Sequence, residues 1–490
     1  MIQPLVYTDF YKTDHRRQYP KGTTEVYSNL TPRGTRIQGI NEVVVFGVQY
    51  FIKEYLIKRF NEGFFNVPKD VAVAKYRRRL DNALGKDAVG MEHIEALHDL
   101  GYLPIKIKAL PEGTECPMRI PLLTIRNTKP EFFWVTNFLE TVLCNVLWGP
   151  ITSATIARKY RKILDGYAEA TSDLPELVSW QGHDFSMRGL MGMEASMVSG
   201  GGHLLSFTGT DTIAAIDFLE EYYGADSDKE LIGGSVPATE HSVMCLGGEG
   251  ESEIDTFRRL ITEVYPSGII SIVSDTWDYW KVITEFLPKL KDEIMARDGK
   301  VVIRPDSGDP TKIICGYDQA KTAGHGDFRA KGSIELMWET FGGTMNSKGF
   351  KQLDSHIGLI YGDSITLDRC EDICAKLLKK GFASTNMVYG IGSYTYQHVT
   401  RDTFGFAMKA TYGVVDGVVK NIYKDPVTDD GLKKSAKGLL KVNSDLTLSE
   451  EVTPEEEDSG LLQQVFLDGK LTNEVTLSQI RDRLSKKANV

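Results

Sequence analysis

The sequence predicts an α/β protein: an irregular (β/α) barrel with a second α+β domain built from both chain termini. Between about residues 177 and 410, short apolar runs alternate with helical patterns. Strand–helix alternation is typical of a parallel sheet with right-handed crossovers. The segments on either side follow different patterns, and 490 residues are too many for one simple core. We therefore expect residues 1–176 and 411–490 to form one domain and residues 177–410 to form the barrel.

Eight apolar runs are the expected strands of the barrel. They are LVSW (178–181), LLSF (204–207), GSVP (234–237), IISIV (269–273), VVI (301–303), IGLIY (357–361), NMVYG (386–390) and FAMKA (406–410). Helical patterns separate most of them. TIAAIDFLEEYYG has apolar residues three and four apart and ends at Gly224, and EIDTFRRLITEVY and TLDRCEDICAKLLKKG behave in the same way. About eight such units indicate a barrel.

The flanking segments predict the second domain. Residues 49–80 and 131–170 have helical patterns, and QQVFLDGKLTNEV contains a hairpin signal with Asp468-Gly469 at the turn. Because this material lies on both sides of the barrel segment, we expect the second domain to combine the two ends of the chain.

Composition restricts the class of protein. The net charge of −10 and the pI near 5.5 argue against a general nucleic-acid binder, although a local basic pocket can still bind a small anion. The six cysteines are few and scattered, so we expect free thiols in a reducing compartment, the cytoplasm. Cys370 and Cys374 share a helix face, where packing explains them without a metal. Neither a signal peptide nor an 18-residue apolar run is present, so we expect no membrane association.

Polar residues follow the expected strands. They are Gly182-His183-Asp184, Gly209-Thr210-Asp211, Glu240-His241, Ser274-Asp275, Arg304-Pro305-Asp306-Ser307-Gly308, Gly362-Asp363 and Gly390-Ile391-Gly392-Ser393. The carboxyl ends of barrel strands carry the chemistry in barrel enzymes. One polar exit is ordinary for a loop, but a series that converges on one rim predicts an active site.

Individual exits suggest particular chemistry. The backbone of the glycine run at 390–393 can bind a phosphate, with Arg401 adding a bidentate contact. The loop from Arg304 to Pro310 supplies a cation and carboxylates that suit sugar hydroxyls or magnesium. Asp275 can fix the tautomer of His241, and Phe185 and Tyr11 can stack on a flat ring. Taken singly, these features also fit a plain turn, a capped helix, a structural histidine and core aromatic residues.

Taken together, the motifs resemble a known family. TDFYKTDHRRQYP, HDFSMRG, FTGTDT, GGSVPATEHS, VSDTWD, VIRPDSGDP, GDS, GIGS with TRD, and KDPVTD occur in the order seen in nicotinamide phosphoribosyltransferases. The resemblance extends from about Thr8 to Asp429. It implies transfer of a phosphoribosyl group from phosphoribosyl pyrophosphate to nicotinamide, which yields nicotinamide mononucleotide and pyrophosphate in NAD salvage. It also implies coupling to ATP hydrolysis through a phosphohistidine, a requirement for Mg²⁺, and a homodimer with shared active sites.

The resemblance implies a role for each matching residue. Phe185 and Tyr11, the latter from the partner subunit, are expected to sandwich the nicotinamide ring, and Asp211 to accept a hydrogen bond from the carboxamide. His241 is the expected phosphohistidine, with Asp275 hydrogen-bonded to it and Asp306 the third catalytic residue. The other expected substrate-binding residues are Asp9, Arg188, Ser235, Ser271, Arg304, Gly362, Asp363, Gly392, Ser393 and Arg401. Asp306 and Asp363 are expected near the metal, and Arg33, Lys409 and Lys424 near the polyphosphate.

Two positions depart from the family pattern. Ser393 stands where the family usually has glycine, and Leu439 where it typically has arginine. Residues 311–355 match poorly and receive no role. Three alternatives remain: a nicotinate phosphoribosyltransferase, against which Asp211 argues; a non-catalytic signalling or scaffold protein; and an unrelated sugar-phosphate barrel enzyme, which leaves Tyr11 and Asp211 unexplained.

Overall fold

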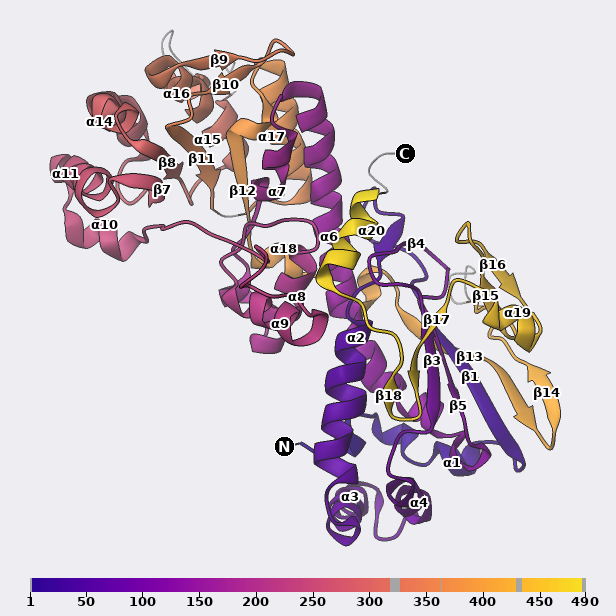
Figure 1. The fold of residues 1–490 in the computed structure, drawn as a ribbon. Coiled ribbons are helices and arrows are strands. Elements are labelled where there is room, and N and C mark those ends of the chain that lie inside the picture. The colour runs from indigo at the N-terminus through magenta and orange to yellow at the C-terminus, as the bar shows by residue number, and fades with distance from the viewer. Residues whose placement is uncertain (1, 318–326, 363, 429–433, 487–490) are drawn as a thin grey trace. The chain divides into compact units, whose positions relative to one another are not determined.

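The described residues of the computed structural model are 2–317, 327–362, 364–428 and 434–486 (Figure 1). They form two compact units. Unit 1 comprises Met1–Thr155, Asp217–Asp226 and Val399–Val490, and unit 2 comprises Ile156–Ile216 and Ser227–His398. The boundary at residue 155 falls inside helix α6 (Glu140–Thr171), whereas the sequence pattern placed it at 176. A helix that continues across a boundary gives no break in periodicity to mark it.

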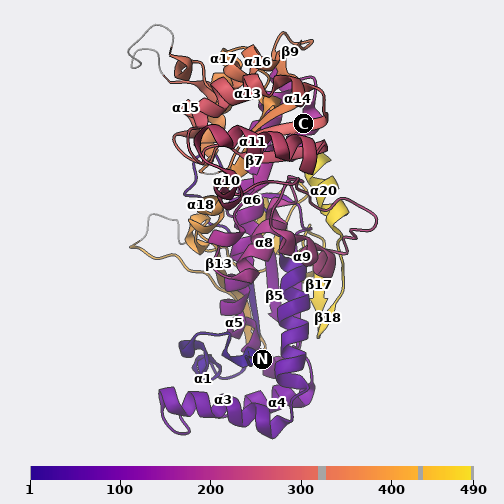
Figure 2. The same ribbon diagram turned by 90° about the vertical axis from the view of Figure 1, so that its left-hand side faces the viewer.

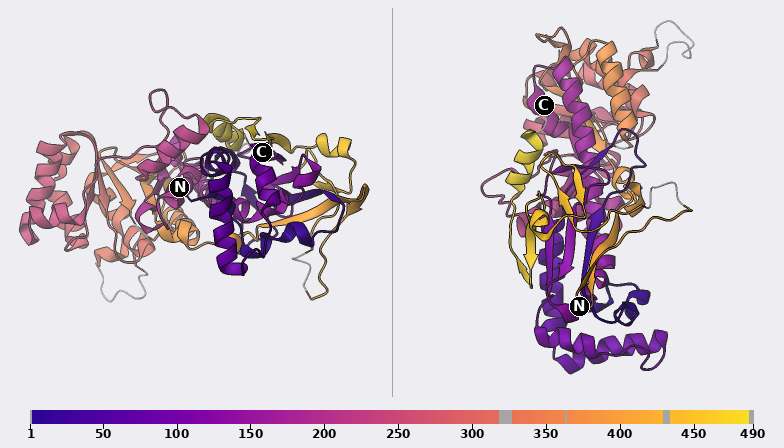
Figure 3. Two further views of the ribbon diagram at one scale, coloured as in Figure 1. Left: turned by 90° about the horizontal axis from the view of Figure 1, so that it is seen from below. Right: turned by 90° about the vertical axis from the view of Figure 1, so that its right-hand side faces the viewer.

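Unit 1 is built around a seven-stranded antiparallel sheet to which both ends of the chain contribute (Figures 1 and 3). In order across the sheet the strands are β14 (Val418–Asn421), β13 (Ala407–Val415), β1 (Thr23–Thr31), β5 (Leu123–Asn127), β3 (Ile105–Ala109), β17 (Gln463–Leu467) and β18 (Lys470–Leu471). The predicted α+β domain made from both termini is therefore confirmed.

Two predictions concern strands of this sheet. The hairpin at Asp468-Gly469 is confirmed: both residues have positive φ, 46° and 81°, as a tight two-residue turn requires. The run FAMKA was expected in the barrel, and this was wrong. It enters β13, which pairs with β1 from Thr23↔Val415 to Thr31↔Ala407. An apolar run shows that a strand is buried, but not which sheet it joins.

Helices pack around this sheet. They are η1 (Pro4–Val6), η2 (Phe10–Lys12), α1 (His15–Gln18), α2 (Val48–Tyr50), the π-helical η3 (Phe51–Arg59) and η4 (Asn61–Phe65), α3 (Lys69–Leu84), α4 (Glu92–Leu100), α5 (Val135–Phe138), α19 (Pro454–Asp458) and α20 (Leu477–Lys486). Helices α3 and α4 lie together at one end of the unit (Figure 2). The smaller pairs β2 (Glu42–Val44) with β4 (Glu115–Pro117), and β15 (Leu440–Val442) with β16 (Leu448–Glu450), complete it.

Unit 2 contains the parallel sheet that the sequence predicted. Its strands are β6 (Gly182–Asp184), β12 (Met387–Ile391), β11 (Ile357–Tyr361), β8 (Asp298–Arg304) and β7 (Ser267–Val273), in that order. Single parallel bridges join Asp184 to Thr210, Gly209 to Gly234, and Ala238 to Ser271. These bridges connect the two edges of the sheet, so the strands close into an irregular barrel.

Besides FAMKA, two of the expected barrel strands were wrong. LVSW forms helix α7 (Val178–Gln181), and LLSF follows the end of α8 (Met193–His203). The strand positions are taken instead by the polar residues after each run, Gly182–Asp184 and the bridged residues Gly209 and Thr210. A strand this short, paired on both sides, needs no apolar pattern of its own because its backbone hydrogen bonds are satisfied by neighbours.

Helices separate the strands of unit 2, as predicted. They are α9 (Ile213–Tyr223), which continues into unit 1 from Asp217, α10 (His241–Gly247), α11 (Glu253–Arg259) with π-helical η9 (Leu260–Val264), α12 (Tyr279–Lys281), α13 (Leu287–Lys289), α14 (Lys291–Met295), α15 (Pro310–Cys315), α16 (Ser333–Phe341), α17 (Leu367–Lys379) and α18 (Ser393–Gln397). The described part of 311–355 contains most of α15, all of α16 and the hairpin of β9 (Gly343–Met345) and β10 (Lys351–Leu353). No described helix is long and apolar enough to cross a membrane. All six cysteines are free thiols, and only Cys245 among them is exposed.

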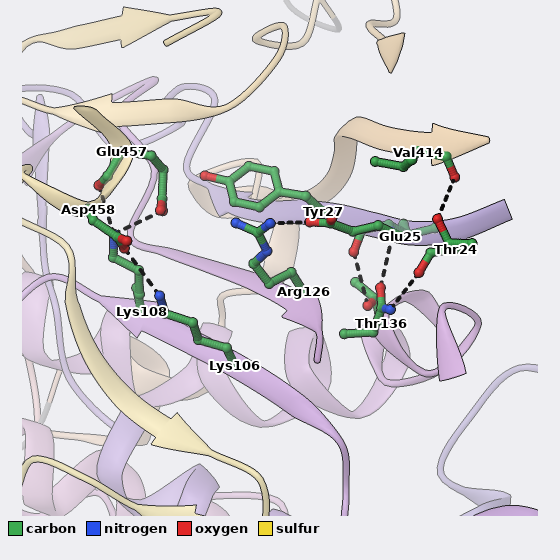
Figure 4. A network of polar contacts seen from close by, with 12 residues as sticks. Thr24, Glu25, Tyr27, Lys106, Lys108, Arg126, Thr136, Val414, Glu457 and Asp458 are labelled. Atoms are coloured by element: carbon green, nitrogen blue, oxygen red, sulfur yellow. Dashed lines mark hydrogen bonds and ion pairs between the residues drawn. The ribbon is translucent and has the colours of Figure 1, made fainter. Parts of the chain in front are cut away.

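A buried ion pair fastens α19 to the sheet of unit 1 (Figure 4). The Lys108 ammonium lies 3.0 Å from the Glu457 carboxylate, and the two side chains are only 5% and 2% exposed. The same ammonium donates to the Glu457 carbonyl at 2.7 Å and to Asp458 at 3.2 Å. Burial raises the pKa of Glu457, against the opposing effect of Lys108. The lysine is therefore what permits a charged carboxylate at this depth.

Replacing Lys108 by Met should lower the free energy of unfolding by about 3 kcal/mol, because it leaves Glu457 buried without a counter-charge. Urea denaturation followed by circular dichroism measures the change. The double variant Lys108→Met/Glu457→Leu should recover most of the loss. Lys106→Met is the matched control, since the Lys106 ammonium contacts the 60% exposed Asp458 at 3.1 Å and its loss should cost less than about 1 kcal/mol. Equal effects of the Lys106 and Lys108 changes would contradict this assignment.

Candidate active site

The carboxyl ends of the barrel strands bring together most of the predicted polar residues. In a parallel barrel all strands end at the same rim, so residues distant in sequence become neighbours there. Asp184 ends β6, Arg304 ends β8, and Asp275, Gly362 and Gly392 each follow a strand within one or two residues. Hydrogen bonds at this rim gather around Asp211 and around Asp275, among other residues.

The first cluster is centred on the Asp211 carboxylate. Its Oδ1 accepts hydrogen bonds from His183 Nε2 at 2.8 Å and from Ser235 Oγ at 2.6 Å. Burial raises the pKa of Asp211, but the hydrogen bonds from His183 and Ser235 and the charge of Arg304 outweigh it, so the net shift is downward. The Asp211 side chain is 44% exposed. The structure therefore presents an ionised carboxylate to whatever enters this side of the rim.

An aromatic face lies beside this carboxylate. The ring centroids of Phe185 and His183 are 4.5 Å apart, and Phe185 is half-buried. The Phe185 amide donates to the Ile391 carbonyl at 3.0 Å, which ties this loop to β12. Arg188, in the short turn η7 (Met187–Gly189), is exposed. An aromatic face next to a negative oxygen suits a flat ring that carries a hydrogen-bond donor.

The second cluster joins three strand exits through Asp275 and Arg304. Its Oδ2 accepts from the Asp306 amide at 2.9 Å and from Ser307 Oγ at 2.5 Å. Arg304 donates from Nη2 to the Thr239 carbonyl at 2.8 Å, and its Nε lies 3.4 Å from Asp306 Oδ1. Asp275 therefore shapes the loop that follows β8. Sequence reasoning gave Ser307 no role, because a serine three residues after an arginine has no distinctive pattern.

His241 begins α10 and is half-exposed. Its Nδ1 lies 3.1 Å from Thr276 Oγ1, while its Nε2 is 3.8 Å from Asp275 Oδ1. The expected hydrogen bond between His241 and Asp275 is therefore not formed in this structure. The other Asp275 oxygen is held by Asp306 and Ser307, which fixes the carboxylate, and Thr276 takes the role of nearest partner to His241.

Glycines at the rim permit close approaches that a side chain would block. A Cβ on Gly362 would lie 2.0 Å from Asp306 Oδ1, and one on Gly189 would lie 2.1 Å from Ser393 Oγ. Gly392 has an extended backbone at the start of α18. The buried Ser271 hydroxyl has no hydrogen-bond partner among the described residues. Asp363 lies outside the described residues.

Unit 1 carries the remaining candidates. Thr141 donates to Asp9 Oδ2 at 2.6 Å, and Tyr11 is 64% exposed with its ring 5.3 Å from that of His15. Arg401 is exposed and lies 3.6 Å from Asp402. Lys424 is also exposed. Exposed aromatic and cationic side chains such as these are available to a ligand or a partner.

A basic pocket of about 180 Å³ in unit 1 contains two of the predicted polyphosphate residues. Arg33 and Lys409 line it, and Arg33 donates to the Gly405 carbonyl at 2.8 Å. Burial, with help from the charges of Arg33 and Lys424, lowers the pKa of Lys409, against the opposing effect of Glu140. The pocket also contains Arg119 and Lys434, which the sequence did not single out. Leu439, the departure from the family pattern, is buried against Tyr27, Tyr412 and Leu440 instead of adding a further cation.

Comparison with known proteins decides the family. A model of the nicotinate phosphoribosyltransferase (NAPRTase) family matches residues 180–474, and a model of the nicotinamide phosphoribosyltransferase N-terminal domain matches residues 3–107. A nicotinamide phosphoribosyltransferase from Acinetobacter baylyi is 54% identical over 99% of this chain and 97% of its own. This chain belongs to the nicotinamide phosphoribosyltransferase family.

Other similar proteins support the same conclusion. The nicotinamide phosphoribosyltransferase of Xanthomonas campestris is 33% identical, with 97% of each chain covered. Two solved structures have a similar fold, although their sequence identity to this chain is low. A nicotinate-nucleotide pyrophosphorylase from Pyrococcus furiosus has a TM-score of 0.55 and 13% identity over 99% of this chain and 95% of its own. Human nicotinic acid phosphoribosyltransferase has a TM-score of 0.52 and 16% identity over 98% and 93%.

The hydrogen bond from the Asp306 amide to Asp275 should protect that amide from hydrogen exchange. Asp275→Ala removes the acceptor of the Asp306 amide, so hydrogen exchange at that amide should accelerate about tenfold to a hundredfold, the equivalent of a charge-assisted hydrogen bond. Hydrogen-exchange mass spectrometry of a peptide that spans Arg304–Asp309 measures it. Asp309→Ala is the matched control, because Asp309 accepts from the Lys312 amide at 3.2 Å and should affect α15 alone. An unchanged exchange rate at the Asp306 amide in Asp275→Ala would show that Asp275 does not hold this loop.

Proposed function

We propose that this protein is a nicotinamide phosphoribosyltransferase that makes nicotinamide mononucleotide and pyrophosphate from nicotinamide and phosphoribosyl pyrophosphate for NAD salvage. The observation that carries the proposal is the ionised Asp211 beside Phe185, in a chain that is 54% identical to a nicotinamide phosphoribosyltransferase. The barrel of unit 2 would hold the pyridine and the sugar, and the partner subunit would supply Tyr11.

The choice between nicotinamide and nicotinate would depend on the negative charge of Asp211. Asp211 would accept a hydrogen bond from the carboxamide NH₂ of nicotinamide, whereas the carboxylate of nicotinate would be repelled. A hydrogen bond to a charged group contributes about 1.5–3 kcal/mol, which is ample for selectivity. Phe185 and the partner subunit's Tyr11 would stack on the two faces of the ring, with Arg188 beside it.

The reaction needs no base to create the nucleophile, because the ring nitrogen of nicotinamide is already uncharged. Its lone pair forms the bond to C1 of the ribose while the bond from C1 to pyrophosphate breaks, and the leaving group takes that electron pair. The ring nitrogen becomes positive, and C1 carries oxocarbenium character on the way. The protein would lower this barrier by holding the ring in line and by stabilising the leaving pyrophosphate with Arg304.

Residues around the ribose and phosphates follow from the same rim. Asp306 would accept from the ribose hydroxyls, and the Gly362 backbone permits its close approach. Gly392, Ser393 and Arg401 would hold the 5′-phosphate, and Ser235 and Ser271 would line the route between ring and sugar. Ser393 differs from the family's usual glycine, so its hydroxyl adds a donor where the family relies on backbone.

The residues fit a magnesium ion that is bound mainly through the substrate. No group of three or more acidic, histidine or cysteine side chains among the described residues could hold a metal alone. Mg²⁺ commonly uses one or two carboxylates together with substrate phosphates, and Asp306 beside Arg304 offers such a carboxylate. When bound, the ion would neutralise charge on pyrophosphate. Asp363 is the second proposed ligand.

We further propose that ATP hydrolysis drives the reaction through His241. Its imidazole is half-exposed, as attack on a γ-phosphorus requires, and phosphoryl transfer to the ring would release ADP. Arg33, Lys409 and Lys424 would bind polyphosphate, which the positive lining of the pocket in unit 1 favours. Leu439 is buried, so this site has one cation fewer than the family pattern. Binding of the polyphosphate would therefore depend more on Lys434, which lines the pocket.

A homodimer with shared sites is supported by exposed apolar surface on unit 1. Phe10 and Tyr11 are 50% and 64% exposed, and β14 exposes Val418 and Val419 at the edge of the sheet. Large exposed apolar residues and a free strand edge mark interaction surfaces. The free thiols fit a cytoplasmic protein, and the net charge of −10 argues against nucleic acid and anionic membranes as partners.

The direct test is mass-spectrometric detection of nicotinamide mononucleotide from nicotinamide, phosphoribosyl pyrophosphate and Mg²⁺, with and without ATP. Product formation that ATP stimulates is expected. Product from nicotinate alone would favour the nicotinate phosphoribosyltransferase alternative. A folded protein without activity on either pyridine would favour a non-catalytic role.

Asp211→Ser should weaken nicotinamide use and relatively favour nicotinate, because the repelling charge and the carboxamide acceptor disappear together. Loss of one charge-assisted hydrogen bond predicts a fall in kcat/KM for nicotinamide of about tenfold to a hundredfold. Steady-state kinetics with both pyridines measures the ratio. A ratio equal to that of the unmodified protein would count against Asp211 as the contact.

His241→Ala should abolish ATP stimulation while slow transfer persists, because the phosphorylated group is lost but the ring and sugar sites remain. Product formation with and without ATP, together with ADP release, provides the measurement. Thr276→Val is the paired variant. It removes only the partner of His241 Nδ1, so it should reduce coupling partially. Full coupling in His241→Ala would remove the histidine from its role.

A further inference from the structure

His203 connects two parts of the rim that the proposed function uses for opposite ends of the substrate. It is the last residue of α8 and is fully buried. Its Nε2 lies 3.0 Å from the carbonyl oxygen of Gly209, two residues before Asp211, and its Nδ1 lies 2.8 Å from the Tyr396 hydroxyl. Tyr396 belongs to α18, the short helix that begins at Ser393. The histidine therefore joins the loop of the proposed pyridine-binding carboxylate to the turn that would hold the 5′-phosphate.

The direction of these two hydrogen bonds follows from the chemistry of the partners. A carbonyl oxygen can only accept, so Nε2 of His203 carries the hydrogen and donates it to Gly209. Burial lowers the pKa of His203, against the opposing charge of Asp184, so the ring is neutral and Nδ1 is unprotonated. Nδ1 therefore accepts from the Tyr396 hydroxyl. Loss of that hydroxyl would leave a buried ring nitrogen unsatisfied.

Aromatic contacts leave the buried ring little freedom. His203 stacks on Phe207 with the ring centroids 5.1 Å apart and 25° between the planes, and the Tyr396 ring meets it edge-on at 6.1 Å. Tyr396 is itself only 5% exposed. Its neighbour on α18, Thr395, is held as well, because Thr395 Oγ1 lies 3.3 Å from the hydroxyl of the buried Tyr160. Since the ring and α18 are both held, the two hydrogen bonds of His203 fix the distance from α18 to the loop.

The two walls of the proposed ring site are tied to the phosphate turn by different means. Phe185 is tied through the main chain, since its amide donates to the Ile391 carbonyl at 3.0 Å. The loop of Asp211 is tied through the side chains of His203 and Tyr396. A substitution of one side chain can therefore loosen the second tie while the first stays in place.

We propose that His203 and Tyr396 are positioning residues that set the distance between the pyridine site at Asp211 and the 5′-phosphate site at Gly392 and Ser393. The inference rests on the proposed function and deepens it. The ring nitrogen must meet C1 of a ribose whose 5′-phosphate is anchored at the second site. An error of about 1 Å between the two sites can therefore cost about a hundredfold in rate. In this role neither side chain contacts the substrate.

A ligand that spans both sites tests the proposal, and nicotinamide mononucleotide is such a ligand. Nicotinamide alone fills the ring site, and ribose 5-phosphate alone fills the phosphate site. Tyr396→Phe removes one hydroxyl and keeps the ring, so both sites remain but their separation is no longer fixed. Isothermal titration calorimetry of the full-length protein should show Kd for nicotinamide mononucleotide raised about tenfold, because the site is less preorganised. Kd for each half ligand should stay unchanged.

A second variant tests whether the two side chains act together. His203→Gln should raise Kd for nicotinamide mononucleotide at least as much as Tyr396→Phe. The double variant should be no worse than His203→Gln, because both changes break the same link. Additive effects would overturn the inference. Tyr396→Phe decides on its own if His203→Gln does not fold.

The same titrations separate positioning from a purely structural role. A structural role would reduce the fraction of competent protein, and hence the binding stoichiometry, and would leave Kd for nicotinamide mononucleotide unchanged. That result would overturn the inference. Equal weakening of all three ligands would also overturn it, because the separation between the sites affects only a ligand that spans them.

Tyr389→Phe is the matched control. Tyr389 is also fully buried in unit 2, but its hydroxyl lies 3.1 Å from Cys374 Sγ on α17. Its replacement should leave all three Kd values unchanged, and an effect equal to that of Tyr396→Phe would overturn the inference. An unmodified protein that neither binds nor forms nicotinamide mononucleotide would overturn the proposed function and this inference together. Binding by the unmodified protein that Tyr396→Phe does not weaken would overturn the inference alone.

Discussion

The buried carboxylate of Asp184 is the constraint on which the rim around Phe185 and Asp211 depends. It is fully buried at the end of β6, where Oδ1 accepts from the amide and hydroxyl of Ser186 at 2.9 and 2.6 Å. Oδ2 accepts from the Thr212 hydroxyl at 2.8 Å. The loop that carries Phe185 and the loop that carries Asp211 are thereby tied to one group. A buried charge is stable only when donors surround it, so any displacement of either loop would leave Asp184 unsatisfied.

This constraint explains why neighbouring acidic residues have opposite uses. Both oxygens of Asp184 accept hydrogen bonds from the protein, whereas the hydrogen bonds to the Asp211 side chain from described residues go to Oδ1 alone. The parallel bridge from Asp184 to Thr210 sets the two in register. In the sequence, HDF and GTDT read as equivalent polar strand exits. Their difference appears only once burial is known, because burial decides which carboxylate needs donors from the protein.

The sequence predicted the long strands of the barrel and failed at the short ones for one physical reason. IISIV and IGLIY lie in β7 and β11, where residues 270–273 and all but one residue of 357–361 are buried, and most of these residues are apolar. The barrel closes through single bridges at Gly209, Gly234 and Ala238, where one or two residues pair without any apolar pattern. Most of the predicted polar residues nevertheless lie at one rim, because polar residues at strand exits identify a rim even when the strands themselves are misplaced. Contacts such as Thr276 with His241 depend on side-chain geometry that no spacing encodes.

Charge distribution, and not net charge, decides what this protein can bind. A net charge of −10 would repel pyrophosphate if it acted as a whole, but screening limits charge interactions in solution to about 8 Å at physiological salt. Within that distance the basic pocket presents Arg33, Arg119, Lys409 and Lys434, with Glu450 as its acidic member. Partial burial of Lys409 favours release of its proton, which an anion would oppose by stabilising the charged form. A polyphosphate bound there would therefore raise the pKa of Lys409 again, because an anion stabilises the charged form of the lysine.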